Sequence, residues 1–137
     1  MKFKLNEMQI EDYQMRNDII KQYQDKTLMG GDPDLMHFTE LPFQVAKKLE
    51  KMGFVDPMES QGESPTAEKM MKFIEEHPKF WLHGYLIIEK RDDTRITFEG
   101  VGCGNDYDEK DLKDFTKMFR HADDFVIEHE RLWAWYD

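Results

Sequence analysis

The sequence predicts an α+β fold: three N-terminal helices, then an antiparallel sheet of about four strands in β-β-α-β-β order, with the helices packed on one face. Apolar residues in the first half recur at spacings of three and four, the period of an amphipathic helix. From Phe80 onward they gather in short runs rich in aromatic and β-branched residues, which are typical of strands. A length of 137 residues suits one globular domain spanning residues 1–137.

The first helix is expected between Asn6 and about Lys26. Asn6 can cap it with Gln9 three residues later, which is a capping-box spacing. Paired glycines and an Asp-Pro step at residues 30–33 then favour a turn. Spacings of four, three, four and four predict the buried stripe of this helix as Met8, Asp12, Met15, Ile19 and Tyr23.

Two further helices are expected before residue 80. One fits residues 42–52, with Gly53 as the left-handed residue beyond its end and Phe54 as the apolar contact behind it. The other begins with Ser64 as its N-cap and Pro65 as its first residue. The stripe predicted to be buried on this third helix consists of Ala67, Met70, Met71 and Ile74.

Residues 80–89 and 95–101 are expected to form a β-hairpin. A three-residue loop from Asp92 to Thr94 gives the neater apolar pairing and places Leu86 opposite Gly100. One face of this hairpin would carry Leu82, Leu86, Ile88, Ile96 and Phe98. The facing relations depend on this register, since a slip of one residue would change all of them.

A fourth helix and two short strands complete the expected order. Asp108 can cap the helix with Asp111 at its third position, before a stripe formed by Leu112, Phe115, Met118 and Phe119. The two strands are expected at residues 125–127 and 132–136.

Composition limits the classes of function. The net charge of −10 opposes the binding of nucleic acid, because phosphate backbones repel an acidic surface. The sequence contains no run of 18 apolar residues, so no membrane span is expected. Its N-terminus lacks an apolar core, so no secretory signal is expected. The chain has a single cysteine, Cys103, which suits a reducing cytoplasm. We therefore expect a cytoplasmic protein that binds neither nucleic acid nor membrane.

The segment from Gly100 to Asp108 holds three glycines at alternate positions ahead of a helix. A tight turn is one interpretation, and a small-ligand loop formed by Gly102, Gly104 and Asn105 is another. The same register would place His83 opposite Cys103, with Asp106 as the nearest carboxylate. These three residues are candidate catalytic groups of a small hydrolase or transferase, since a histidine can activate a thiol.

No metal and no cofactor are predicted. Asp106 and Asp108 have the spacing that opens a calcium loop, but Asp111 and Lys117 occupy the positions where glycine and glutamate are required.

The last strand carries bulky apolar residues on both faces. Trp133 and Trp135 share one face, and Tyr136 lies on the other; all three are candidate interface residues, since Trp and Tyr are enriched at binding hot spots. The favoured expectation is an acidic protein-interaction module, immunity-like or regulatory, that binds a basic protein or a second copy of itself. Small acidic proteins that neutralise basic toxins have this general size and charge. The enzyme and the small-ligand-binding domain remain the alternatives.

Overall fold

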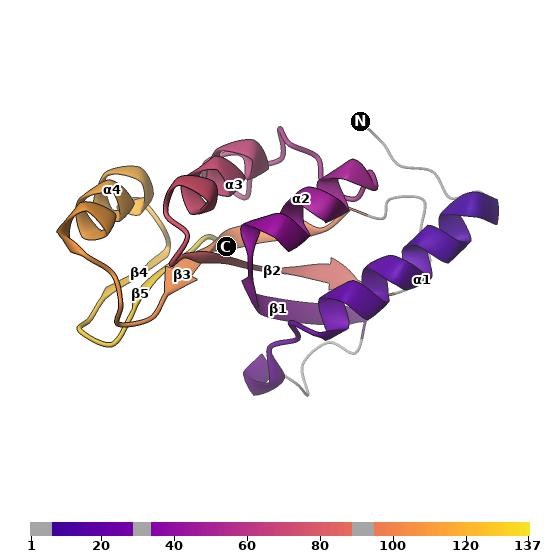
Figure 1. Cartoon of the computed structure of the whole chain (residues 1–137), viewed down its shortest axis with the longest axis horizontal. Coiled ribbons are helices and arrows are strands. Elements are labelled where there is room, and N and C mark those ends of the chain that lie inside the picture. The colour runs from indigo at the N-terminus through magenta and orange to yellow at the C-terminus, as the bar shows by residue number, and fades with distance from the viewer. Residues whose placement is uncertain (1–6, 29–33, 89–94) are drawn as a thin grey trace.

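The computed structural model describes residues 7–28, 34–88 and 95–137. Within these ranges the elements follow one another as the labels of Figure 1 indicate. The helices are α1 (Glu7–Lys21), α2 (Phe43–Lys51), α3 (Ala67–Glu76) and α4 (Glu109–Phe119), with a 3-10 turn η1 (Lys26–Leu28). The strands are β1 (Leu35–Leu41), β2 (Trp81–Ile87), β3 (Thr97–Cys103), β4 (Asp124–Ile127) and β5 (Leu132–Trp135).

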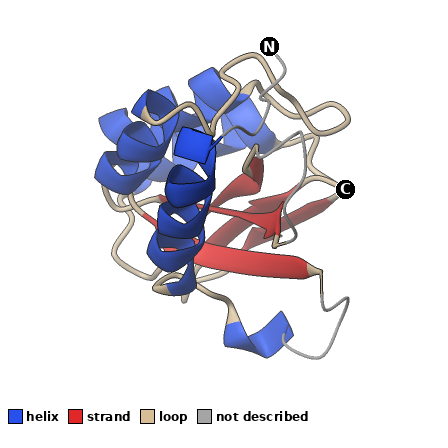
Figure 2. Ribbon diagram, turned by 90° about the vertical axis from the view of Figure 1, so that its right-hand side faces the viewer, coloured by secondary structure: helices blue, strands red, loops and turns tan. Residues whose placement is uncertain are grey.

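The five strands form one sheet in the order β1-β2-β3-β5-β4, and each neighbouring pair is antiparallel. Figure 2 shows the α-helices gathered on one side of these strands. The predicted α+β class, the antiparallel sheet and the β-β-α-β-β order of the second half are therefore confirmed. The predicted strand number is wrong, because β1 lies between the first two helices.

Strand β1 was not predicted, although its buried residues alternate. Met36 and Phe38 face the core, and His37 between them is only half-buried. Glu40 has a φ of 57°, and the register with β2 shifts between Phe38 and Leu41. This irregularity turns Leu41 into the core at a spacing of three, which conceals the period of two that identifies a strand.

The predicted stripe of α1 is only partly correct: its last two residues pack against the core, but the fully buried residues of the helix lie beside it. Met15 is 49% exposed, whereas Tyr13, Arg16 and Ile20 are buried. Arg16 lies 4.5 Å from the centre of the Tyr13 ring and donates a hydrogen bond of 2.9 Å to the carbonyl oxygen of Ile87. A charged residue thus occupies a core position, which a search for apolar spacing does not find.

The ends of α2, α3 and α4 follow capping chemistry. Gly53 has a φ of 91°, in agreement with its predicted left-handed position after α2. Asp108 and Asp111 form the predicted capping box of α4, with hydrogen bonds of 2.8 and 3.1 Å. The predicted cap of α3 is wrong by two residues, because Thr66 caps it while the Ser64 hydroxyl accepts from the backbone nitrogen of Gln61.

The register between β2 and β3 differs from the predicted one by three residues, since Gly100 lies opposite His83 instead of Leu86. The ends of the two strands bond elsewhere: the backbone nitrogen of Ile88 donates to the carbonyl of Asp34, and that of Ile96 to the carbonyl of Phe54. These contacts tie the two strand ends to other segments of the chain. The predicted turn at residues 92–94 lies outside the described residues.

The sheet has one face covered by helices and one face without them. The covered face carries a continuous core that includes Leu82, Phe98, Val101 and Ala134. The alternate residues of the strands point to the other side, which we call the open face; it carries Trp81, His83, Trp133 and Trp135. None of the helices in the described ranges is both long and apolar enough to cross a membrane.

Candidate functional site

The two glycines of β3 that face the open side make room for aromatic rings. A Cβ atom at Gly102 would lie 3.1 Å from both the Trp133 and the Trp81 ring. A Cβ atom at Gly100 would lie 1.9 Å from the carbonyl oxygen of Ala134 and 2.8 Å from the His83 ring. The alternate glycines therefore serve close packing across strands, and Gly102 has no free space beside it for a ligand.

His83 lies beneath this aromatic layer. Its ring stacks on Trp133 with centroids 3.9 Å apart and planes at 9°, and its Nε2 donates to the Ala134 carbonyl oxygen at 2.7 Å. Burial lowers the pKa of His83 to about 4, which two backbone carbonyls only partly offset. The imidazole is therefore neutral near pH 7, and its hydrogen bond fixes its orientation.

A cavity of about 390 Å³ opens on the same face. Trp133 and Trp135 of β5 form aromatic walls, and both side chains are half-exposed. The polar groups come from five separate segments: Asp25 ahead of η1, His37 of β1, His83 of β2, Glu99 of β3 and Asp124 of β4. This volume and this mixture of aromatic walls with a few convergent polar groups are typical of small-ligand sites.

Among the acids that line this cavity, Glu99 is the one whose carboxyl pKa departs most from its ordinary value. It lies at a β-bulge, because His83 pairs with Gly100 while the next residue of β2 pairs with Phe98. The residue is 8% exposed, and burial raises the pKa of its carboxyl to about 7. A hydrogen bond with Trp135 opposes this rise, and repulsion by Asp137 adds to it. Perturbed carboxyls of this kind are concentrated at functional sites.

The predicted catalytic group of Cys103, His83 and Asp106 is not assembled. Cys103 pairs with Leu132 and lies in the core on the helix-covered face, whereas His83 stacks on the open face. The predicted facing of these two residues is wrong because the register differs. Burial raises the pKa of the Cys103 thiol to about 12, so the reactive thiolate is disfavoured. Asp106 is exposed in the loop after β3.

The other predicted residues are divided between the surface and the core. Trp133 and Trp135 line the cavity, but Tyr136 is 1% exposed and packs in the core. Gly104 and Asn105 follow β3 in the same loop as Asp106, and their role in ligand binding stays a prediction. Sequence reasoning missed Glu99, His37, Asp25 and Asp124. Glu99 immediately precedes the alternate glycines, which was the one local signal available for it.

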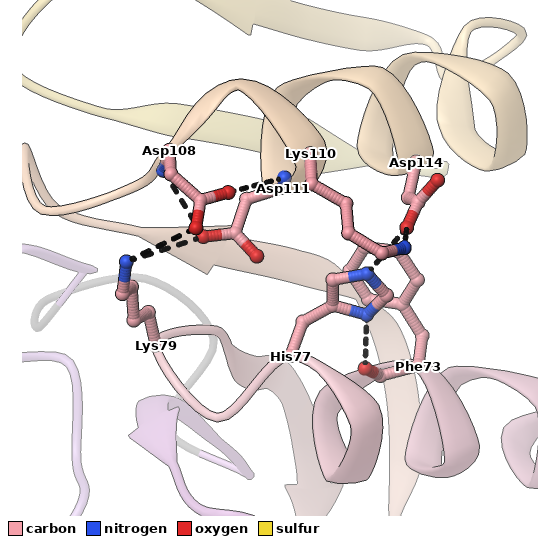
Figure 3. A network of polar contacts seen from close by, with 7 residues as sticks. All are labelled: Phe73, His77, Lys79, Asp108, Lys110, Asp111 and Asp114. Atoms are coloured by element: carbon pink, nitrogen blue, oxygen red, sulfur yellow. Dashed lines mark hydrogen bonds and ion pairs between the residues drawn. The ribbon is translucent and has the colours of Figure 1, made fainter.

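A second polar cluster joins the end of α3 to α4 (Figure 3). The Nδ1 atom of His77 lies 2.8 Å from the carbonyl oxygen of Phe73, and its Nε2 lies 2.8 Å from the Asp114 carboxylate. Each ring nitrogen of His77 therefore faces a hydrogen-bond acceptor. Lys110 also contacts Asp114, at 2.6 Å, and with His77 it lowers the pKa of that carboxyl to about 2.

The same cluster continues toward the start of α4. Lys79 lies 3.5 Å from the Asp111 carboxylate and 3.8 Å from that of Asp108, the two residues of the capping box. The basic groups in Figure 3 thus contact acidic groups of the same cluster. Because its charges are paired with one another, we interpret this cluster as a structural contact between the end of α3 and α4. The candidate functional site is therefore the cavity on the open face.

The described residues contain no group of three or more His, Cys, Asp or Glu side chains with the geometry of a metal site. The fold and the cavity define an α+β domain with one helix-free sheet face that is aromatic and acidic. Comparison of the chain with protein-family models, curated proteins and solved structures finds no match.

Proposed function

We propose that this protein is a non-enzymatic binding module that recognises a basic protein through the open face of its sheet. The observation that carries the proposal is the position of Trp133 and Trp135, two half-exposed indoles side by side on a face without helices. Tryptophan supplies a large contact area and is among the residues most enriched at binding hot spots. These two side chains support the proposal because they would give such a module a contact surface.

Charge distinguishes between the two partners considered for this surface. The chain carries a net charge of −10, and Asp25, Glu99 and Asp124 lie beside the two indoles. A second copy would bring identical carboxyl groups together across the interface, which repulsion disfavours. A basic protein would instead be attracted over distance and would associate faster at low ionic strength. We therefore favour a basic partner over a homodimer.

The three lysines of α2 do not interrupt this surface. Lys47, Lys48 and Lys51 belong to α2, on the helix side of the sheet, and Lys47 is paired with Glu50 at 2.7 Å. The biological role that fits such a module is the neutralisation or regulation of its basic partner. A cytoplasmic location accords with its single buried cysteine.

The test is capture from lysate of the source cells with three immobilised variants. Trp135→Ala removes one indole, Asp124→Lys reverses an exposed charge on the same face, and Met118→Ala removes an exposed apolar side chain from α4 as a control. The wild type and the Met118→Ala variant should retain the same basic protein. Both open-face variants should lose it, and the circular dichroism of all three should match the wild type.

Two outcomes would contradict the proposal. One is a specific partner that the Trp135→Ala and Asp124→Lys variants retain as well as the wild type does. The other is a concentration-dependent dimer in sedimentation equilibrium that Trp135→Ala abolishes, which would assign the open face to self-association.

A further inference from the structure

The chemistry of the open-face cavity defines the group that it can bind. Asp25, Glu99 and Asp124 contribute three carboxyl groups, and Trp133 and Trp135 contribute two indoles. No lysine or arginine within the described ranges lines the cavity. Carboxylates attract cations, and the faces of aromatic rings carry a negative potential that adds to this attraction. The lining therefore matches a positively charged group.

The chain itself contains an example of this contact. The guanidinium carbon of Arg131 lies 5.6 Å from the centre of the Trp133 ring, which is within the range of a cation–π contact. Arg131 is exposed and follows the turn between β4 and β5, and it is not part of the cavity lining. Trp133 thus already binds a guanidinium group at one position on its ring.

Glu99 is the group within the cavity whose ionised form a bound cation would stabilise most. No lysine or arginine of the described chain pairs with its carboxyl, which is buried at the bulge of β3 opposite β2. The uncompensated burial is what raises its pKa to about 7. A cation entering the cavity would supply the missing countercharge and would favour the ionised carboxylate.

We propose that this cavity binds the guanidinium group of an arginine side chain that the basic partner presents. The inference rests on the proposed function, because the arginine belongs to the protein recognised by the open face. Arginine suits the cavity better than lysine for two reasons. Its planar head can stack on an indole while it donates two hydrogen bonds to a carboxylate, and it is less strongly hydrated than an ammonium group.

Binding should depend on pH through Glu99. Arginine keeps its charge at every pH of interest, so a change in affinity between pH 6 and pH 8 reports on the cavity and not on the ligand. The titratable groups around Glu99 are Asp25, His37, His83, Asp124 and Asp137. Ionisation of Glu99 in this interval should strengthen arginine binding about tenfold, because the ionised fraction of a carboxyl with a pKa of about 7 is about tenfold larger at pH 8 than at pH 6.

The probe is N-acetyl-arginine methylamide, titrated into the full chain while the indole N–H signals of the three tryptophans are followed by NMR. The matched ligands are the corresponding derivatives of lysine and of citrulline, which has the shape of arginine without its charge. We expect a dissociation constant of roughly 1 mM at pH 8 for arginine, since few contacts are formed. Lysine should bind several-fold more weakly, and citrulline should produce no saturable shift.

Variants assign the effect to Glu99. Glu99→Gln keeps the size of the side chain and should weaken arginine binding at pH 8 about tenfold and remove its pH dependence. His37→Asn should keep that pH dependence, which separates Glu99 from the neighbouring imidazole. Asp124→Asn changes an exposed residue, so it tests the carboxyl set without risk to the core.

The outcomes separate this inference from the proposed function. Equal binding of arginine and citrulline, or unchanged binding by Glu99→Gln, would overturn the arginine site even if a partner were captured through Trp135. Saturable arginine binding that requires Glu99 would support the site even if no basic protein were captured. Stronger binding of lysine than of arginine would assign the cavity to an ammonium group and overturn the choice of arginine.

Discussion

Replacing Glu99 with glutamine should remove a specific dependence of stability on pH. The pKa of this carboxyl rises from 4.5 to about 7 in the folded protein. Between these values the folded chain holds a proton that the unfolded chain has lost, so the free energy of unfolding falls as pH rises. Above pH 7 both states are ionised and the loss is complete. At about 1.4 kcal/mol for each pH unit, the loss reaches about 3 kcal/mol.

Solvent in the open cavity screens part of this energy, so we expect a difference of about 2 to 3 kcal/mol. Glutamine keeps an oxygen that can accept from the Trp135 indole but cannot ionise. Urea unfolding should therefore show the Glu99→Gln variant to be more stable than the wild type at pH 8 and equal to it at pH 4. The contributions of the other titrating groups are the same in the wild type and the variant, so they cancel when the two are compared at one pH. An advantage of the same size at both pH values, or a less stable variant at pH 8, would refute the reasoning.

The remaining predictions concern packing, thiol burial and the polar cluster between α3 and α4. Gly100→Ala should lower the free energy of unfolding by about 3 kcal/mol or more in urea titrations, because its Cβ would lie 1.9 Å from a backbone oxygen. The control Gly104→Ala meets its nearest atom at 3.9 Å and should change it by less than about 0.5 kcal/mol, so equal losses would contradict the packing argument. Cys103 should resist a thiol reagent at neutral pH in the native protein and react after unfolding; rapid native labelling would contradict its burial. Asp114→Asn should lower the melting temperature at pH 7, and the difference should shrink as the pH approaches 2, where the wild-type carboxyl gains its proton; a difference that is independent of pH would exclude the carboxylate as its cause.

The parts of the fold that the sequence predicted are those in which local pattern and burial agree. The stripe of Ala67, Met70, Met71 and Ile74 is buried as expected, because α3 lies flat on the sheet with one face inward. The capping box of α4 is local by nature and was also predicted. The features of the fold that the sequence did not predict depend on tertiary contacts. Arg16 occupies a core position, although a sequence pattern would place a charged residue at the surface.

The candidate site could be predicted only in part for the same reason. Trp133 and Trp135 were identified because both lie on one strand and alternate along it. Glu99 and His37 are more than 60 positions apart in the sequence, and only the sheet order places them around one cavity. His83 was identified with the wrong partner, since its neighbour depends on a register that distant backbone contacts determine.

The bulge at Glu99 also marks a position where the chain can change in length during evolution without rearranging the core. Phe98 faces the helices, and so do Val101 and Cys103, although an unbroken alternation would have put Phe98 on the opposite side from them. Deleting Glu99 would restore a regular alternation, with Phe98, Val101 and Cys103 still directed at the helices and Gly100 still directed at the open face. Homologues without this residue should therefore keep the same core and lack only the carboxyl that the bulge adds beside the cavity.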